Sequence, residues 1–213
     1  MDEKELAAQL RKPDGEIGLK VGEMMNKGNA NFYHQLPNLL NGLNCSSVLE
    51  IGMGAGLHCQ QVCEALNVKS YAGLDYSETM VTQATKNNSK LDVSTFFQAN
   101  AASIPLHDNE FDLILTINTV YFFESLSAVF KEIHRVLKPG GKLVIGKRTK
   151  ENLELLNAFT QYGFNKLSGK EVIDTALKQD FELIKETTYT EPVFEWNGDT
   201  VQLHSEFIVL EKR

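Results

Sequence analysis

The chain has 213 residues, with 21 basic and 28 acidic side chains and a formal net charge of −7. This length is enough to bury a core without disulfides or metals. The acidic balance argues against adhesion to nucleic acid or anionic membranes, which depends on clustered Lys and Arg. Three cysteines without C-x-x-C pairing (Cys45, Cys59 and Cys63) predict a reducing, cytoplasmic location. No apolar run approaches the roughly 18 residues of a membrane span, and residues 1–5 do not resemble a signal peptide, so we expect no membrane partner.

Residues 1–44 predict a helical cap. Apolar residues recur at helical spacing, interrupted at residues 13–15 and at Gly28-Asn29, which are typical of turns. The pattern therefore predicts two or three short helices. A further helix over residues 30–40 has an apolar face, and we expect it to pack as a lid on a single ligand-binding unit formed by residues 45–213.

From residue 46 the chain alternates short apolar strands with helices, which is typical of parallel strands joined by right-handed crossovers. Two final runs, 181–190 and 204–211, predict an antiparallel pair joined by a loop over 192–199. The other expected strands are 47–51, 69–74, 95–98, 111–116 and 142–146, and the expected helices are 57–66, 77–87, 125–137, 151–162 and 169–178.

Three glycines, Gly52, Gly54 and Gly56, follow the first of these strands. Glycine can adopt positive φ and lets the backbone approach a ligand closely. Because Leu57 occupies the sixth position, the loop differs from the dinucleotide pattern G-x-G-x-x-G, and it lacks the Gly-Lys ending of a phosphate-binding P-loop. The loop therefore predicts a nucleotide-like ligand that need not carry phosphate.

Ligands of open α/β sheets bind beyond the carboxyl ends of the strands. Asp75, nineteen residues after Gly56, lies at such a position, where a carboxylate can accept hydrogen bonds from two ribose hydroxyls. The alternative for Asp75 is a solvated acid in a turn. Further strand ends carry Glu50, Tyr76, Asn100 with Ala101, residues 118–121, and Lys147 with Arg148.

Five motifs occur in a fixed order, at residues 49–56, 73–77, 99–106, 111–114 and 137–141. Together they resemble the class I S-adenosylmethionine-dependent methyltransferases, of the small-molecule methyltransferase-11/25-like type, over about residues 46–146. The resemblance implies a Rossmann-like, doubly wound α/β fold with a seven-stranded, mostly parallel sheet and an antiparallel last strand. It also implies S-adenosyl-L-methionine as cofactor and S-adenosyl-L-homocysteine as product.

The resemblance further implies roles for individual residues. Asn100 stands where Asp is commoner, and its amide oxygen can accept the same bond from the adenine amine, although Asn100 is also typical of a turn. Tyr33, on the cap, is implied to close over the cofactor. The implied cofactor-binding residues are Glu50, Gly52, Met53 and Gly54 for the methionine moiety, Gly56 at the helix start, Asp75 for the ribose, Tyr76, Met80, Asn100 and Ala101 for the adenine, and Asn118 and Tyr33.

Residues 118–121 end the fourth strand, where the methyl acceptor is expected. They lack the double proline of the Asn-Pro-Pro-Tyr type, which resembling DNA-adenine and protein-glutamine methyltransferases use, so we expect a small-molecule acceptor and no nucleic acid. They also lack the acidic residue at 118 that metal-dependent, catechol-type enzymes would need, so we expect no metal ion. We expect the protein to be a monomer or homodimer. Lys147 and Arg148 either hold an anionic group or are solvated. Aromatic candidates for the acceptor site are Phe122, Phe123, Phe159, Tyr162, Phe164 and Trp196.

Methyl transfer from a sulfonium depends on alignment and exclusion of water more than on acid or base help. If a base is needed, Tyr33, Tyr121 and His34 are the candidates. Packing is the alternative role for Tyr33, and an exposed surface position is the alternative for His34.

Two other function classes stay open. One is an NAD(P)-binding oxidoreductase, which would normally carry G-x-G-x-x-G. The other is a regulatory protein that binds S-adenosylmethionine without turnover.

Overall fold

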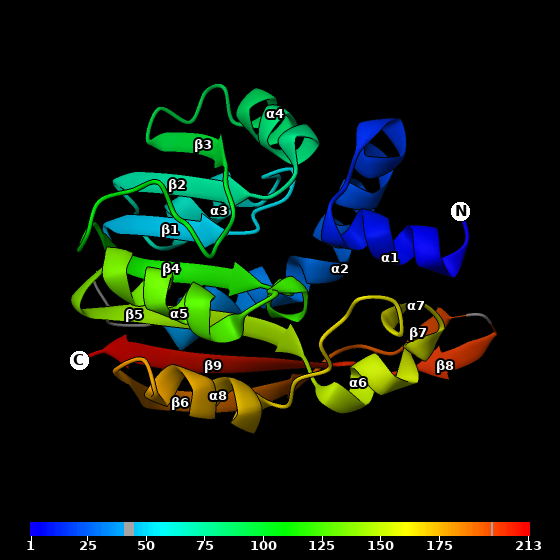
Figure 1. The fold of residues 1–213 in the computed structure, drawn as a ribbon. Coiled ribbons are helices and arrows are strands. Elements are labelled where there is room, and N and C mark those ends of the chain that lie inside the picture. The colour runs from blue at the N-terminus through cyan, green and yellow to red at the C-terminus, as the bar shows by residue number, and fades with distance from the viewer. Residues whose placement is uncertain (41–44, 197) are drawn as a thin grey trace.

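The computed structural model of the chain describes residues 1–40, 45–196 and 198–213. One seven-stranded sheet has the order β3-β2-β1-β4-β5-β9-β6 (Figure 1). Strand β9 runs antiparallel to both β5 and β6, whereas the other pairs are parallel, which confirms the predicted α/β fold with an antiparallel last strand. The strands are β1 (Ser47–Ile51), β2 (Ser70–Asp75), β3 (Ser94–Gln98), β4 (Phe111–Ile117), β5 (Leu137–Arg148), β6 (Phe181–Thr190) and β9 (His204–Lys212).

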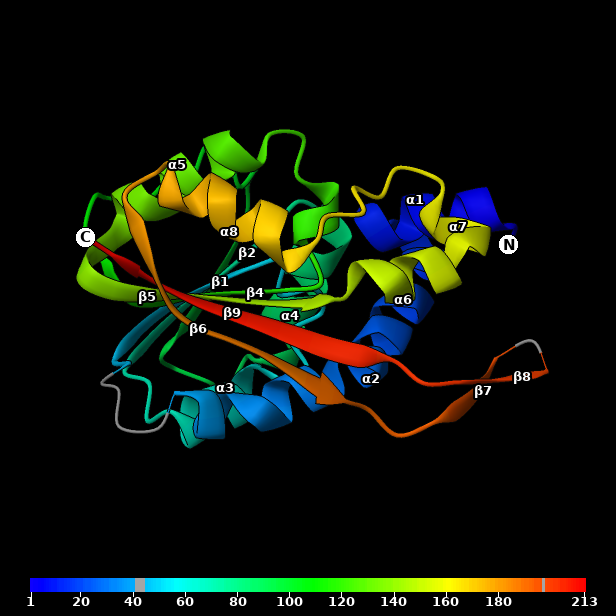
Figure 2. The ribbon, with the colours of Figure 1, turned by 90° about the horizontal axis from the view of Figure 1, so that it is seen from below.

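Helices cover both faces of the sheet (Figure 2). Successive residues of β1 show why: Val48 and Leu49 are both fully buried, on opposite faces. Leu49 belongs to the core cluster under α5 (Leu126–Val136) and α8 (Gly169–Leu177). Val48 belongs to the cluster under α2 (Gly15–Leu39) and α3 (Cys59–Ala65). A further helix, α4 (Glu78–Asn87), begins at Ser77, whose side chain accepts a hydrogen bond from the amide of Met80.

The N-terminal region consists of α1 (Glu3–Arg11) and the single helix α2, so the predicted turn at Gly28-Asn29 is wrong. A glycine inside a helix costs about 1 kcal/mol, which tertiary contacts outweigh here. Arg148 Nη2 donates to the carbonyl of Gly28 at 3.0 Å. Phe32 is fully buried, with its ring centroid 5.3 Å from that of Phe207. The second half of α2 is therefore part of the core.

The predicted boundary between cap and ligand-binding unit, at residues 44 and 45, touches residues 41–44, which lie outside the described residues. That division stays a prediction.

Two C-terminal predictions need correction. The single helix expected over 151–162 is instead α6 (Lys150–Leu155) followed by α7 (Asn157–Thr160). The expected loop over 192–199 contains a β-ribbon formed by β7 (Phe194–Trp196) and β8 (Asp199–Val201), which extends away from the body of the molecule (Figure 2). In Figure 1, α1, α6 and α7 gather beyond the carboxyl ends of β1, β4 and β5. This is the edge of the sheet where ligand binding was expected.

No helix in the described parts of the chain has the length and apolar character needed to cross a membrane.

Candidate functional site

The glycine loop follows β1 and has the backbone conformation expected for it. Gly52, Gly54 and Gly56 have φ of +78°, +57° and +64°. A Cβ on Gly52 would lie 2.1 Å from Thr119 Cγ2, so the loop packs directly on the segment that follows β4. A Cβ on Gly54 would meet no atom within 4 Å, because this glycine borders a cavity.

The carboxylate of Asp75 lies beside this loop. Its Oδ2 accepts a hydrogen bond of 2.9 Å from the amide of Gly54, and its Oδ1 accepts one of 2.8 Å from the amide of Ser77. Asp75 is only 8% exposed, and burial raises its pKa above the ordinary value although these amides oppose the shift. Each carboxylate oxygen retains capacity to accept a further hydrogen bond. Asp75 and the glycine loop, each predicted to bind the cofactor, thus lie in direct contact.

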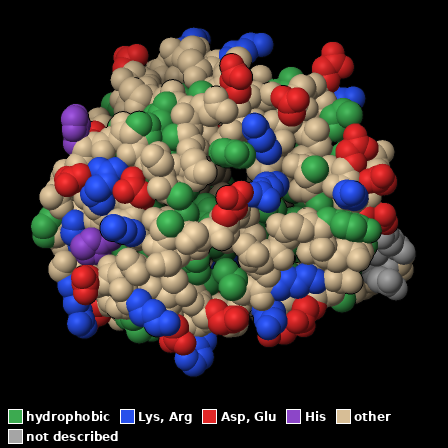
Figure 3. Space-filling model, in the orientation of Figure 1, with side chains coloured by type: hydrophobic (Ala, Val, Ile, Leu, Met, Phe, Trp, Pro, Cys, Tyr) green, Lys and Arg blue, Asp and Glu red, His purple; other side chains and the backbone are tan. Residues whose placement is uncertain are grey.

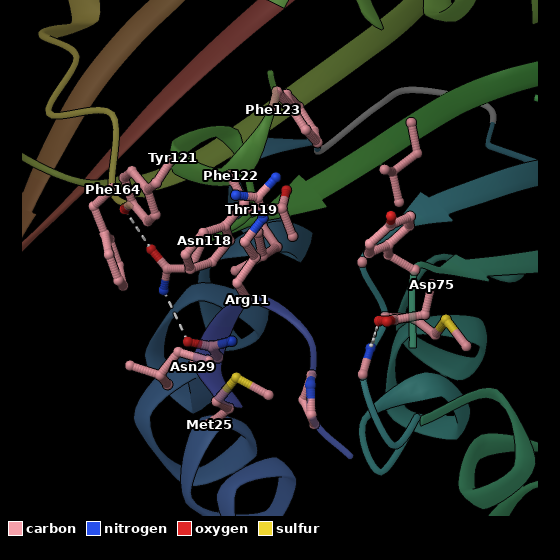
Figure 4. A pocket seen from close by; sticks show the side chains of 18 of the residues that line it. Arg11, Met25, Asn29, Asp75, Asn118, Thr119, Tyr121, Phe122, Phe123 and Phe164 are labelled. Atoms are coloured by element: carbon pink, nitrogen blue, oxygen red, sulfur yellow. Dashed lines mark hydrogen bonds between the residues drawn. The ribbon is translucent and has the colours of Figure 1, made fainter. Parts of the chain in front are cut away.

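A cavity of about 460 Å³ opens beside the loop and Asp75. The space-filling view shows the molecule hollowed near its centre, between acidic and basic side chains (Figure 3). In the close-up, Asp75 lies on one side of the cavity, while Met25, Asn29, Tyr121 and Phe164 lie on the other (Figure 4). We call these two sides the Asp75 side and the Phe164 side.

The Asp75 side is lined by most of the predicted cofactor-binding residues. Tyr76 is 48% exposed, and Lys12 Nζ lies 4.9 Å from its ring centroid. The Oδ1 atom of Asn100 accepts a hydrogen bond of 2.9 Å from the amide of Ala102, as in an Asx turn. Of the predicted cofactor-binding residues and candidate bases, those that line the cavity are Gly52, Met53, Gly54, Asp75, Tyr76, Asn100, Ala101, Asn118, Tyr33 and Tyr121. The aromatic candidates that line it are Phe122, Phe123, Phe159 and Phe164.

Met80 does not lie at the cavity surface, contrary to the prediction that it flanks the adenine. It is fully buried, and its Sδ would lie 3.0 Å from a Cβ placed on Gly22. Met80 therefore fills the contact between α4 and α2. Gly56 is likewise placed away from the cavity lining, where a Cβ would meet the side chains of Asn88 and Ala84.

Glu50 also lies away from the cavity lining, at the centre of a buried hydrogen-bonded cluster. Its Oε1 accepts from Tyr33 Oη at 2.7 Å, its Oε2 accepts from Tyr71 Oη at 2.6 Å, and His58 Nε2 lies 2.9 and 3.0 Å from the two oxygens. Burial would raise the pKa of Glu50, but the nearby His58 and the hydrogen bonds outweigh burial and hold it below the ordinary value. The ring of Tyr33 stacks on His58 at 3.7 Å. Glu50 therefore links α2 and β2 to the strand that leads into the glycine loop.

The three candidate bases differ in position. His34 is exposed on α2 and does not line the cavity, because it lies on the side of the helix that faces away from the sheet. Tyr33 and Tyr121 do line the cavity, but their hydroxyls are engaged with Glu50 and Asn118, respectively. Burial raises the pKa of both tyrosines well above the ordinary value of 10.0. Both are therefore hydrogen-bond donors at neutral pH.

A chain of side-chain hydrogen bonds crosses the Phe164 side. Tyr121 Oη donates to Asn118 Oδ1 at 2.7 Å, and Asn118 Nδ2 donates to Asn29 Oδ1 at 2.8 Å, as Figure 4 shows. Asn118 has φ +53° at the end of β4, and its Oδ1 also accepts from the amide of Arg148 at 3.2 Å. The left-handed backbone conformation of Asn118 thus directs its side-chain amide across the cavity toward α2.

Asn29 was not predicted as a site residue. A signal for it exists in the sequence, since Gly22, Met25, Asn29 and Tyr33 are spaced by three or four residues and share one helix face. Reading Gly28-Asn29 as a turn concealed that face. All four of these residues line the cavity.

Helix α1 closes the cavity from outside. Its Arg11 forms an ion pair of 2.9 Å with Glu124, which follows the short helix η1 (Val120–Phe122). Leu6 and Leu10 of the same helix line the cavity. Of residues 30–40, which were expected to form a lid, Tyr33 alone lines the cavity, whereas α1 contributes Leu6, Leu10 and Arg11.

The anion-binding role considered for Lys147 and Arg148 does not fit their contacts. Both are buried rather than solvated, Lys147 with Glu206 and Arg148 with Glu191. Among residues 1–40, 45–196 and 198–213, no group of three or more His, Cys, Asp or Glu side chains is arranged to hold a metal ion.

Comparison with known proteins places this arrangement in a family. The Methyltransf_11 model, a methyltransferase domain, matches residues 49–145. Phthiotriol/phenolphthiotriol dimycocerosates methyltransferase 1 of Mycobacterium ulcerans is 27% identical over 132 residues, which cover 62% of this chain and 48% of that protein. An uncharacterized protein of Methanocaldococcus jannaschii is 32% identical over 148 residues, covering 65% of this chain and 66% of that protein. The chain spans about half the length of the first of these relatives.

Among solved structures, a chain in the complex between the Haloferax volcanii Trm112 methyltransferase activator and a putative methyltransferase matches with a TM-score of 0.76. It covers 97% of this chain and 96% of that chain at 16% identity, so the likeness concerns the fold. The order of motifs, the sheet topology and the family match agree, and they identify residues 49–145 as a methyltransferase domain of the class I S-adenosylmethionine-dependent type.

Proposed function

We propose that the chain binds S-adenosylmethionine on the Asp75 side of the cavity and transfers its methyl group to a small-molecule acceptor on the Phe164 side. The observation that supports this most is the pair of hydrogen bonds that hold Asp75 beside Gly54 in the cavity wall. A carboxylate in this position, with acceptor capacity to spare, suits the two hydroxyls of a ribose.

The other residues of this side fit the same cofactor. The open space at Gly54 admits a ligand against the backbone, and the exposed ring of Tyr76 offers an apolar face for adenine. Leu57 occupies the sixth position of the loop, where the dinucleotide-binding pattern G-x-G-x-x-G has a glycine. This favours S-adenosylmethionine over a nicotinamide dinucleotide.

The cofactor, when bound, supplies a methyl group on a sulfonium that is already activated. The contribution of the chain is to hold both partners in line and to exclude water. Tyr33 and Tyr121 keep their protons, because burial raises the pKa of both hydroxyls. We infer that they orient neighbouring groups through Glu50 and Asn118 and do not accept a proton from the acceptor.

We also propose that the protein works in a reducing compartment such as the cytoplasm, as a monomer or homodimer, without nucleic acid as a partner. Its net charge of −7 and its three buried, unpaired cysteines support this.

Calorimetric titration with S-adenosylmethionine, S-adenosylhomocysteine and NADH tests the cofactor. We expect the first two to bind and NADH not to bind; binding of NADH alone would show that the chain is a dinucleotide-binding protein. Incubation with methyl-labelled S-adenosylmethionine and a metabolite extract then tests turnover. Label in a small-molecule product supports the enzyme, whereas cofactor binding without any labelled product favours the regulatory alternative.

A further inference from the structure

The Phe164 side of the cavity has a wall of hydrocarbon and aromatic side chains. Leu6 and Leu10 come from α1, Met25 comes from α2, and Leu156 precedes α7, while α1 itself lies against α7. The rings of Phe122 and Phe164 meet edge to face with centroids 4.6 Å apart. Segments far apart in the sequence thus supply one continuous apolar surface, which favours a ligand with an apolar body.

The charged side chains that line the cavity, other than Asp75, each contact a charged or titratable neighbour. Arg11 pairs with Glu124 at 2.9 Å at the cavity mouth. Arg148 pairs with the nearly buried Glu191 and also donates to the carbonyl of Gly28 at 3.0 Å. His58, under the glycine loop, is bound to Glu50 at 2.9 Å. Among the described residues that line the cavity, every Arg, His and Glu therefore has an oppositely charged or titratable partner. An ionised ligand group would have to compete with these existing partners for a counter-charge, and burying it without one would be unfavourable.

The side-chain amide of Asn29 is a polar group on this side that is available to a ligand. Two hydrogen bonds determine the orientation of the Asn29 side-chain amide. Because Tyr121 Oη donates to Asn118 Oδ1, the other end of that amide, Asn118 Nδ2, donates to Asn29 Oδ1. The nitrogen of Asn29 therefore faces away from Asn118, as Figure 4 shows. No described residue accepts a hydrogen bond from Asn29 Nδ2, and this half-buried side chain lines the cavity.

We propose that the acceptor is an uncharged, lipophilic molecule that presents a hydrogen-bond-accepting oxygen to Asn29 Nδ2 and lays its apolar body against Met25, Leu156 and Phe164. Molecules with an ionised carboxylate or phosphate in the cavity are excluded from this class. The proposal rests on the proposed function, because it concerns the second substrate of that reaction. The proposal describes how the acceptor is bound and does not specify which of its atoms is methylated.

Two naphthalene derivatives of similar shape test the charge requirement. 2-Acetylnaphthalene has a neutral carbonyl group, whereas 2-naphthoate has an ionised carboxylate in the same place. We expect calorimetry in the presence of S-adenosylhomocysteine to show the ketone binding at least about tenfold more tightly. Equal or tighter binding of 2-naphthoate would overturn the proposal.

Asn29→Leu tests the hydrogen bond. The loss of one donor should weaken 2-acetylnaphthalene by about tenfold and leave unsubstituted naphthalene unchanged, since that ligand has no oxygen. An equal loss for both ligands, or no loss for either, would contradict the role of Asn29.

Met25→Lys tests the apolar wall by placing an unpaired cation in it. We expect the variant to bind 2-naphthoate more tightly and 2-acetylnaphthalene more weakly than the unmodified chain. Ile17→Lys is the matched control, because Ile17 is an apolar residue of the same helix, 45% exposed and outside the cavity lining. If both variants change ligand preference alike, the effect is one of overall charge and the proposal fails.

The two proposals fail in different ways. Failure to bind S-adenosylhomocysteine in a preceding titration counts against the proposed function, while the ketone preference can still be measured on the chain alone. Normal binding of S-adenosylhomocysteine with preference for the carboxylate counts against this inference only.

Discussion

The hydroxyl of Tyr33 donates a hydrogen bond of 2.7 Å to Glu50 Oε1, and so joins helix α2 to the strand that carries the glycine loop. Both residues are buried, and Glu50 has no contact with solvent. The bond therefore couples the position of the N-terminal region to that of the glycine loop.

Tyr33→Phe should lower the free energy of unfolding by about 1–3 kcal/mol, because it removes one donor from a buried carboxylate. Urea denaturation measures the change. Tyr162→Phe is the control, since Tyr162 is 41% exposed and should change stability little. Equal stability of the unmodified chain and Tyr33→Phe would show that Glu50 does not depend on this bond.

Asp75→Ala should weaken binding of S-adenosylmethionine by about 1.5–3 kcal/mol, because ribose hydroxyls and the amides of Gly54 and Ser77 would lose their acceptor. Calorimetric titration gives the affinity. Asp92→Ala, at an exposed position before β3, should bind as the unmodified chain does. An unchanged affinity for Asp75→Ala would place the ribose elsewhere.

Gly52→Ala should destabilise the fold more than Gly54→Ala does. Both residues have positive φ, which costs a Cβ-bearing residue about 1–2 kcal/mol. Only at Gly52 does the added Cβ also collide with Thr119, at 2.1 Å from Cγ2.

The collision between a Cβ at position 52 and Thr119 Cγ2 also provides a control for Gly52→Ala. Adding Thr119→Ser removes Cγ2, so the double variant should regain part of the lost unfolding free energy. No recovery in urea denaturation would assign the whole cost to backbone strain.

Asp112 provides a pH-dependent prediction at the opposite edge of the sheet. Burial opposes ionisation, but hydrogen bonds from Lys138 at 2.8 Å and from Ser47 and Ser46 outweigh it, and lower the pKa of Asp112 from 3.8 to about 2. Because the folded chain favours the ionised form, this stabilisation is present above pH 3.8 and is lost as the pH falls through about 2.

Asp112→Asn should therefore lower the free energy of unfolding by about 1–2 kcal/mol at neutral pH. This figure allows for the weakening of the ion pair by solvent, because Lys138 is partly exposed. The difference between the two proteins should shrink as the pH falls below about 4. Urea denaturation at several pH values checks this, with the exposed Asp92→Asn as control. A difference that stays constant down to pH 2 would contradict the assigned cause.

Much of the sheet could be predicted from local sequence. Central strands such as β1 and β4 are short apolar runs, and Gly52, Gly54 and Asp75 follow strands whose carboxyl ends meet at one edge. These features depend on neighbours in the chain and on the general geometry of parallel sheets.

Features that depend on distant contacts could not be predicted in this way. Helix α2 continues through Gly28 because Arg148, 120 residues away, bonds to its carbonyl. The side chain of Glu50 turns into the core because Tyr33 and Tyr71, from separate elements, bind it there. Met80 packs against Gly22, and only the folded chain brings those residues together.

Helix α2 serves two purposes along its length. Met25 and Asn29, in its first part, line the cavity, as does Tyr33 farther along, whereas Phe32 and Leu36 are buried in the core. Substitutions that alter acceptor choice are thus tolerable in the first half, while those in the second half alter folding. Homologues that diverge in acceptor should differ most at positions such as Met25 and Asn29 and should retain large apolar residues at 32 and 36. A shortened chain that begins after this helix would lose part of its core along with one wall of the cavity.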